Sequence, residues 1–131
     1  MVNARSKGAR GEREFCNWLK DALDLSFLPT RNLEQVRSGG ADVLDIPPFI
    51  FEVKRVEKPN KRKWWLQVKA ACQSGDVPVV AYRKNRQPWR FLISAAVIGL
   101  EHGFIQLEEM EFKQWIKQFI GKGAVAYDVT E

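Results

Sequence analysis

The segment that most restricts this chain is FIFEVKR, residues 49–55, because its short apolar run is typical of a β-strand. Side chains at positions i and i+2 of a strand point to the same face, so Glu52 and Lys54 should emerge side by side from an otherwise apolar segment. Two prolines directly before the run predict a tight return of the preceding segment, which carries Asp42. We therefore expect two carboxylates and a lysine to meet on adjacent strands.

This set of Asp42, Glu52 and Lys54 suits the hydrolysis of a phosphodiester. Two carboxylates on neighbouring strands repel each other, and a hard divalent cation relieves the repulsion by taking oxygen ligands from both. A lysine beside them can orient or deprotonate the attacking water and stabilise developing negative charge. The alternative is structural: Glu52 and Lys54 form a solvent-facing ion pair, and Asp42 caps a turn. The three residues alone leave both possibilities open.

Hydrophobic periodicity and turn residues predict the rest of the secondary structure. Apolar residues at helical spacing predict helices over residues 9–25, 63–74 and 108–121. Strand-like runs predict five strands, at residues 33–37, 41–46, 49–55, 77–83 and 89–94, of which the last two should form a hairpin. We expect an α/β fold with a central mixed five-stranded sheet flanked by helices, in a single domain over residues 1–131.

Composition excludes several classes of protein. The two cysteines, Cys16 and Cys72, are far apart, and His102 is the only histidine, so zinc sites of the usual spacing and histidine-based triads are excluded. The sequence contains neither an apolar run long enough to span a bilayer nor the apolar core of a secretory signal. We therefore expect a cytoplasmic protein that has no membrane partner.

Positive charge is concentrated in one part of the chain. The net charge is +5, and 18 of the 21 lysines and arginines lie within residues 1–100. Two clusters stand out, at residues 54–63 with Glu57 as the one acid, and at residues 83–90 with no acid. Either cluster could be an ordinary solvated surface, but a polyanion such as DNA would dock at this end of the chain.

Several segments resemble a known family. GGADVLDIPPFIFEVK, residues 39–54, resembles the D-(x)n-(D/E)-x-K core of the PD-(D/E)xK nuclease superfamily, with Ala41 in place of the proline. The archaeal-type Holliday junction resolvases, and the small phage-encoded endonucleases related to them, are similar in three further segments: SKGARGEREF at 6–15, RSGGAD at 37–42 and PVVAYRKNRQPWRFL at 78–92. The segment WWLQVKAACQSG, residues 64–75, is nearer to the phage-type proteins than to the resolvases. This difference from the resolvases bears on the identity of the DNA substrate more than on the chemistry.

The resemblance implies a restriction-endonuclease-like fold and a bound Mg²⁺, for which Mn²⁺ can substitute. The metal ligands that it implies are Glu12, Asp42, Glu52 and the carbonyl of Val53. Catalytic roles are implied for Asp42, Glu52, Lys54, which would orient the water, Ser38 and Gln67, although a plain surface glutamine is an equal alternative for Gln67. Contacts with DNA phosphates are implied for Arg5, Lys7, Arg10, Arg13, Arg37, Arg55, Lys58, Lys61, Arg62 and Lys63.

The function implied by the resemblance is that of a Mg²⁺-dependent structure-specific DNA endonuclease. The expected substrate is the branched four-way DNA of a Holliday junction, which a homodimer would cut symmetrically. Two alternatives stay open: a phage nuclease acting on DNA ends, flaps or nicks, and a non-catalytic DNA-binding module of the same fold. If the protein is phage-encoded, it would work in the host cytoplasm.

The tryptophans and the C-terminal helix suggest where partners could bind. Trp18 and Trp115 lie on apolar helix faces and are expected in the core. Trp64 and Trp65 are adjacent at a helix start, so they are not expected both to face the core, and a position of one of them at the DNA surface or at a subunit interface is an open alternative. The acidic C-terminal helix, rich in aromatic residues, is a candidate dimer surface, with packing onto the sheet as the alternative.

Overall fold

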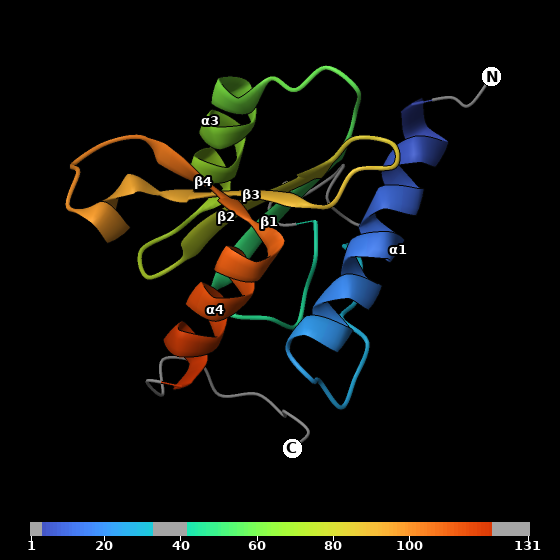
Figure 1. The fold of residues 1–131 in the computed structure, drawn as a ribbon, viewed down its shortest axis with the longest axis horizontal. Coiled ribbons are helices and arrows are strands. Elements are labelled where there is room, and N and C mark those ends of the chain that lie inside the picture. Colours follow the sequence, from blue (N-terminus) through green and yellow to red (C-terminus); the bar gives the residue numbers. More distant parts are fainter. Residues whose placement is uncertain (1–3, 33–41, 122–131) are drawn as a thin grey trace.

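The computed structural model describes residues 4–32 and 42–121. In chain order the elements are α1 (Ala4–Ala22), β1 (Phe49–Arg55), α3 (Lys61–Ala71), β2 (Val77–Arg83), β3 (Arg90–Ser94), the 3₁₀ helix η1 (Ala95–Ile98), β4 (Phe104–Glu108) and α4 (Glu109–Phe119). The helix α3 covers one face of the sheet, and α1 and α4 pack against the other (Figure 1).

The sheet is mixed, with its strands in the order β1-β2-β3-β4. β1 and β2 are parallel and are joined through α3, whereas β2, β3 and β4 are successive antiparallel neighbours. Parallel strands need such a crossover, while antiparallel strands can be joined by a turn. The predicted α/β fold, a mixed sheet flanked by helices, is confirmed, and so is the hairpin in its second half.

The described sheet has four strands, not the five predicted. Residues 33–37 lie outside the described part of the chain. Over the described residues 42–46 the predicted strand is wrong, because this stretch makes only an isolated bridge, between Arg31 and Val43. Asp45 adopts the left-handed backbone region, with a φ of 74°, and the two prolines that follow have no N–H to donate. Both features prevent the segment from continuing a hydrogen-bonded ladder.

The larger apolar cluster lies between the sheet and the helices α1 and α4. Phe91 of β3 stacks on Phe112 of α4, with ring centroids 3.8 Å apart. The apolar face of α4 is thus used for packing onto the sheet, which was one of the two alternatives for this helix. Trp18 and Trp115 are partly buried against the same cluster, in agreement with their expected place in the core.

The smaller cluster lies between the sheet and α3, and it contains both adjacent tryptophans. The ring of Trp64 lies 5.3 Å from that of Tyr82 on β2, and the ring of Trp65 lies 5.7 Å from that of Phe104 on β4. Each tryptophan is only 6% exposed, so the expectation that they would not both face the core is wrong. Trp65 finds its partner on β4, a strand that was not predicted because it runs directly into the glutamates that open α4.

Candidate active site

β1 distributes its side chains between the two faces of the sheet. Phe49, Phe51 and Val53 are buried in the larger cluster. By the alternation of a strand, Glu52 and Lys54 lie on the opposite face, which α3 covers. The Nζ of Lys54 is 3.2 Å from Oε1 of Glu52, and the two side chains are 24% and 13% exposed. The acid and the lysine therefore form a partly enclosed pair on one face, as the sequence predicted.

Asp42 is held against the same strand by two hydrogen bonds. Its N–H donates to the carbonyl of Phe51 at 2.8 Å, and its Oδ2 accepts from the N–H of Val53 at 2.7 Å. These partners flank Glu52, so Asp42, which is 2% exposed, lies beside the middle of β1. The N–H and C=O of one strand residue point to the same edge, so the carbonyl of Val53 also faces the Asp42 side.

Glu12, the third predicted acidic ligand, comes from α1 and has an arginine partner. Its Oε1 lies 3.1 Å from Nε of Arg31, which in turn is bridged to Val43, the neighbour of Asp42. Within the part of the chain that the structure describes, no three acidic, histidine or cysteine side chains are grouped so that they could hold a metal ion. The oxygen donors along β1 are therefore the carboxylates of Asp42 and Glu52 and one backbone carbonyl.

Comparison with known families identifies the class of enzyme in which this arrangement of residues occurs. A sequence profile of the family described as "Phage putative PDDEXK endonuclease" matches residues 3–113. The chain belongs to this family. No curated protein and no solved structure matches the chain significantly.

Membership of the phage PDDEXK endonuclease family confirms the resemblance at the level of the small phage nucleases. It makes the chain a nuclease of the PD-(D/E)xK type, with hydrolysis as its reaction class and DNA as its substrate class. Nucleases of this type generally use divalent metal ions. Among the described helices, none is both long and apolar enough to cross a bilayer.

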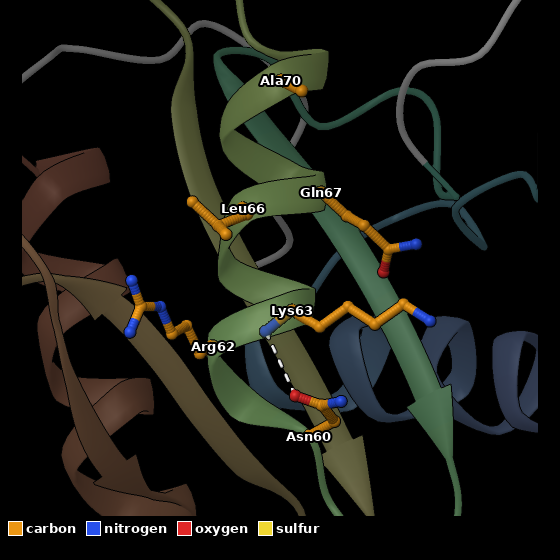
Figure 2. Close-up of a pocket in the computed structure, with 6 residues that line it drawn as sticks. All are labelled: Asn60, Arg62, Lys63, Leu66, Gln67 and Ala70. Carbon is orange, nitrogen blue, oxygen red and sulfur yellow. Dashed lines mark hydrogen bonds between the residues drawn. The ribbon is translucent and has the colours of Figure 1, made fainter.

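Gln67 of this phage-family nuclease lies on the exposed side of α3. Figure 2 shows its side chain extending to the same side of the helix as that of Lys63, whereas Arg62 and Leu66 extend to the other side. The helix is capped by Asn60, whose Oδ1 accepts a hydrogen bond from the N–H of Lys63 at 3.3 Å. An open groove of about 530 Å³ follows this helix surface. A catalytic role for Gln67 stays a prediction.

The basic residues predicted to contact DNA are found at two places. On α1, Arg10 and Arg13 are exposed, and Arg5 and Lys7 belong to the first turns of the same helix. Around the start of α3, Lys58, Arg62 and Lys63 are exposed, and Lys61 is half-buried. Arg37, together with the catalytic candidate Ser38, lies outside the described residues.

Arg55 differs from the other predicted DNA contacts because it is committed to internal partners. Its Nη1 lies 2.7 Å from Oε2 of Glu14 on α1, its Nη2 donates to Oδ1 of Asn85 at 2.7 Å, and its side chain is 11% exposed. Gly11 lets α1 approach this closely, since a Cβ there would lie 2.4 Å from Cγ of Arg55. Arg83 shares Glu14 at 3.0 Å. Arg55 therefore joins α1 to the end of β1, a role that no sequence pattern indicated because Glu14 is distant in sequence.

Cys16 lies on α1 near Glu12 and Arg31, and its thiol is a poor nucleophile. Burial raises the pKa of Cys16 to about 11; Arg31 lowers it, and Glu12 and Asp45 raise it further. A thiol with this pKa stays protonated at neutral pH, whereas the nucleophile and metal ligand is the thiolate. Cys16 therefore takes no chemical part in the neighbouring site.

Proposed function

We propose that this phage-family nuclease is a Mg²⁺-dependent DNA endonuclease whose active site is built from Asp42, Glu52 and Lys54. The proposal is supported above all by how these residues meet on β1. Glu52 and Lys54 form a 3.2 Å pair on one face, and Asp42 is hydrogen-bonded to the backbone on both sides of Glu52. An ordinary surface ion pair would not need a buried aspartate bonded beside it.

The oxygen atoms along β1 fit a hard divalent cation. Asp42 and Glu52 supply carboxylates and Val53 a carbonyl, and Mg²⁺ is typically held by one or two carboxylates while it keeps several waters. Mn²⁺ takes the same kinds of ligand. When bound, the ion would supply a Lewis acid that polarises the phosphate and acidifies water. Glu12 is already paired with Arg31 through Oε1, so we assign it a secondary role.

Lys54 would handle the proton and the charge of the reaction. Its ammonium group donates to Glu52, which keeps the side chain directed along the α3 face of the strand. From there it can hold an attacking water by a hydrogen bond and stabilise the negative charge that develops on the phosphate. Ser38 and Gln67 would assist in positioning the water or the phosphate.

The finer part of the proposal concerns the substrate. We propose that it is a four-way DNA junction cut by a homodimer, because a two-fold dimer presents two identical sites to two symmetric strands. The similarity of residues 6–15 and 37–42 to junction resolvases supports this choice. DNA of an infecting phage is processed in the host cytoplasm, and we propose that the protein acts there.

The experiment that tests the proposal is cleavage of a labelled four-way junction, with a linear duplex of the same arms for comparison. Mg²⁺ is titrated against the wild type, Asp42→Asn and Glu52→Gln, with Glu101→Gln as a matched control because Glu101 is an exposed acid outside the site. We expect both site variants to bind the junction but not to cut it, and Glu101→Gln to cut like the wild type.

The outcomes separate the possible functions. Paired symmetric nicks in the junction alone, dependent on metal, would support a resolvase. Equal cutting of junction and duplex would keep the nuclease and reject the junction preference, in favour of a nuclease for ends, flaps or nicks. DNA binding by the wild type without cutting on any DNA would reject the enzyme in favour of a binding module.

A further inference from the structure

A polar cavity lies on the α3 side of the sheet, and neither Asp42 nor Glu52 is among its described lining residues. It has a volume of about 370 Å³ and is formed by the first turn of α3 together with β2, β3 and β4. Three basic side chains line it, those of Lys61, Lys84 and Arg90, and none of the described lining residues is acidic. Such a lining suits a negatively charged group.

Strand register aligns this cavity with the candidate active site. Lys54 on β1 is paired with Tyr82 on β2, and Tyr82 is paired with Arg90 on β3. Residues paired across strands share a face, so the three side chains form a row across the α3 side of the sheet. The lysine of the candidate active site stands at one end of this row, and an arginine of the cavity stands at the other.

The length of the row matches the spacing of phosphates in DNA. Neighbouring strands lie about 4.8 Å apart, which puts the backbone of Arg90 about 10 Å from that of Lys54. One strand of DNA advances about 3.4 Å along its axis per nucleotide. A phosphate in the cavity would therefore lie about three nucleotides from a phosphate at Lys54.

The floor of the cavity is a buried tyrosine held in a fixed position. Tyr82 is 4% exposed, packs against Trp64, and donates a hydrogen bond from its hydroxyl to Oε1 of Gln106 at 2.7 Å. The Nζ of Lys61 lies 5.9 Å from the centre of the Tyr82 ring, which keeps this cation at the cavity. Burial raises the pKa of Tyr82, Arg90 lowers it and Glu108 raises it. The hydroxyl stays protonated at neutral pH and adds no negative charge.

The charge of the cavity is only partly compensated by its surroundings. Nη1 of Arg90 lies 2.6 Å from Oε2 of Glu108, whose side chain is 55% exposed. A guanidinium carries five N–H donors, so this contact leaves donors of Arg90 for a ligand. Lys84 is exposed at the turn between β2 and β3, where it lines the cavity. Three cations and one neighbouring acid leave the site positive.

We propose that this cavity binds a backbone phosphate of the DNA, a few nucleotides from the phosphodiester that is cut, through Lys61, Lys84 and Arg90. The inference rests on the proposed nuclease function and adds a second phosphate site that takes no part in the chemistry. With one phosphate at Lys54 and another in the cavity, the DNA strand that joins them is held in a defined direction relative to the sheet. The substrate then needs intact backbone on one particular side of the cut.

The test combines protein variants with DNA in which single phosphates are neutralised. The double variant Lys61→Gln/Lys84→Gln removes two charges, and Lys61→Arg/Lys84→Arg keeps them. Lys117→Gln is the control, because Lys117 lies on α4, on the other face of the sheet. Each protein is titrated by fluorescence anisotropy, without Mg²⁺, against DNA carrying one methylphosphonate at successive positions around the cleavage point.

We expect one methylphosphonate, about three nucleotides from the cut, to weaken binding by the wild type, by the arginine variant and by Lys117→Gln. The same substitution should have a much smaller effect on the double glutamine variant, since Arg90 is then the only one of the three basic side chains left to meet this phosphate. On duplex arms, the slope of log Kd against log salt should also be smaller for the double glutamine variant than for the wild type, by about 0.9 for the phosphate contact that is lost. If the double glutamine variant bound DNA weakly only because its fold was disturbed, the effect would not be confined to one phosphate position.

The inference would be overturned if, at every methylphosphonate position, the losses of binding caused by the protein variant and by the DNA change simply added. It would also be overturned if the double glutamine variant had the same salt slope as Lys117→Gln. If the wild type still cuts DNA in that case, only the cavity assignment fails; a wild type that neither binds nor cuts DNA rejects the proposed function as well. Inorganic phosphate that changes tryptophan fluorescence equally with and without DNA would assign the cavity to a free anion and overturn the DNA site.

Discussion

At the scale of single residues, the chemistry of this nuclease depends on which partner each ionisable side chain has. Lys54 is paired with Glu52 two positions away, and strand alternation made this pair predictable. The next residue, Arg55, is paired with Glu14 on α1, and no local pattern could indicate that contact. Adjacent basic residues of one strand thus have different roles, one at the candidate site and one in the packing of α1.

Replacing Lys54 tests the role of the residue most directly. We expect Lys54→Gln to lower the single-turnover rate of DNA cleavage by about 10²- to 10⁴-fold, the usual contribution of a positioned proton-transfer group. Binding without Mg²⁺ should change little, because one charge among many is lost. The control is Lys117→Gln, a change of the same kind on α4. Cleavage by Lys54→Gln at the wild-type rate would show that the lysine is not catalytic.

Cys16 should make stability fall at alkaline pH. A cysteine thiol ordinarily has a pKa of 9.0, and burial raises the pKa of folded Cys16 to about 11, so between these pH values the unfolded thiol loses its proton while the folded thiol keeps it. The free energy of unfolding is therefore unaffected by Cys16 below about pH 9 and falls as the pH rises toward 11. Cys16→Ala should show a shallower decline in urea unfolding measured across this range, and an equal decline would contradict the assignment.

The same burial should protect Cys16 from alkylation. Iodoacetamide at pH 8 should modify Cys72, which is only half-buried, before Cys16 in the folded protein. Both thiols should react in urea. Mass spectrometry of the digested protein reads out the order, and equal modification of the two in the native state would show that Cys16 is accessible.

At the scale of elements, α3 connects the parts of the site. It is the crossover between the parallel strands β1 and β2, and it covers the face that carries Glu52 and Lys54. Its first turn borders the basic cavity through Lys61, and its next turns seal the sheet with Trp64 and Trp65. One helix therefore supplies both packing and a basic surface, from different sides of its axis.

Substitution of Trp65 tests whether this helix is anchored as the structure indicates. Trp65→Ala should lower the free energy of unfolding by about 3–5 kcal/mol, as expected for a buried tryptophan. Leu66→Ala, at the next position with a side chain that is 60% exposed, should change it by less than about 0.5 kcal/mol. Both are measured by urea unfolding followed by circular dichroism. A small effect of Trp65→Ala would contradict burial of Trp65 and favour its assignment to a DNA-binding or partner surface.

At the scale of the whole molecule, the proposed paired cutting of a junction depends on where two copies of this fold could meet. The described part of α4 packs its aromatic residues onto the sheet, so a dimer surface there would have to use the outer side of the helix. The paired cuts of a junction nonetheless require two sites, which a two-fold dimer supplies.

Mixing subunits tests this requirement. When wild type is mixed with inactive Glu52→Gln and the subunits are allowed to exchange, a dimer should yield junctions nicked in one strand only, because half of each mixed dimer is inactive. Gel analysis distinguishes these nicked junctions from resolved duplexes. If the enzyme worked as a monomer, dilution by the variant would slow cutting without changing the ratio of nicked to resolved products.

Local patterns accounted for much of the fold and of the candidate site. The helices α1, α3 and α4 and the strands β1, β2 and β3 lie close to their predicted positions, since each has its own apolar period and turn residues. The strand predicted over 41–46 failed because backbone conformation at Asp45 and the following prolines outweighed its apolar residues. β4 was missed because it runs directly into the glutamates that open α4, with no glycine or proline between the two elements to mark the end of the strand.

The sequence by itself determined the acidic and basic residues of β1 and the face that they share, because both are properties of neighbouring residues. It also determined the family, because that match needs only the order of residues along the chain. Only the tertiary structure decided which acids neutralise Arg55, Arg83 and Arg90, that both Trp64 and Trp65 are buried, and that Lys54, Tyr82 and Arg90 stand in one row. These features depend on strand order and register, which bring together residues that are far apart in the chain.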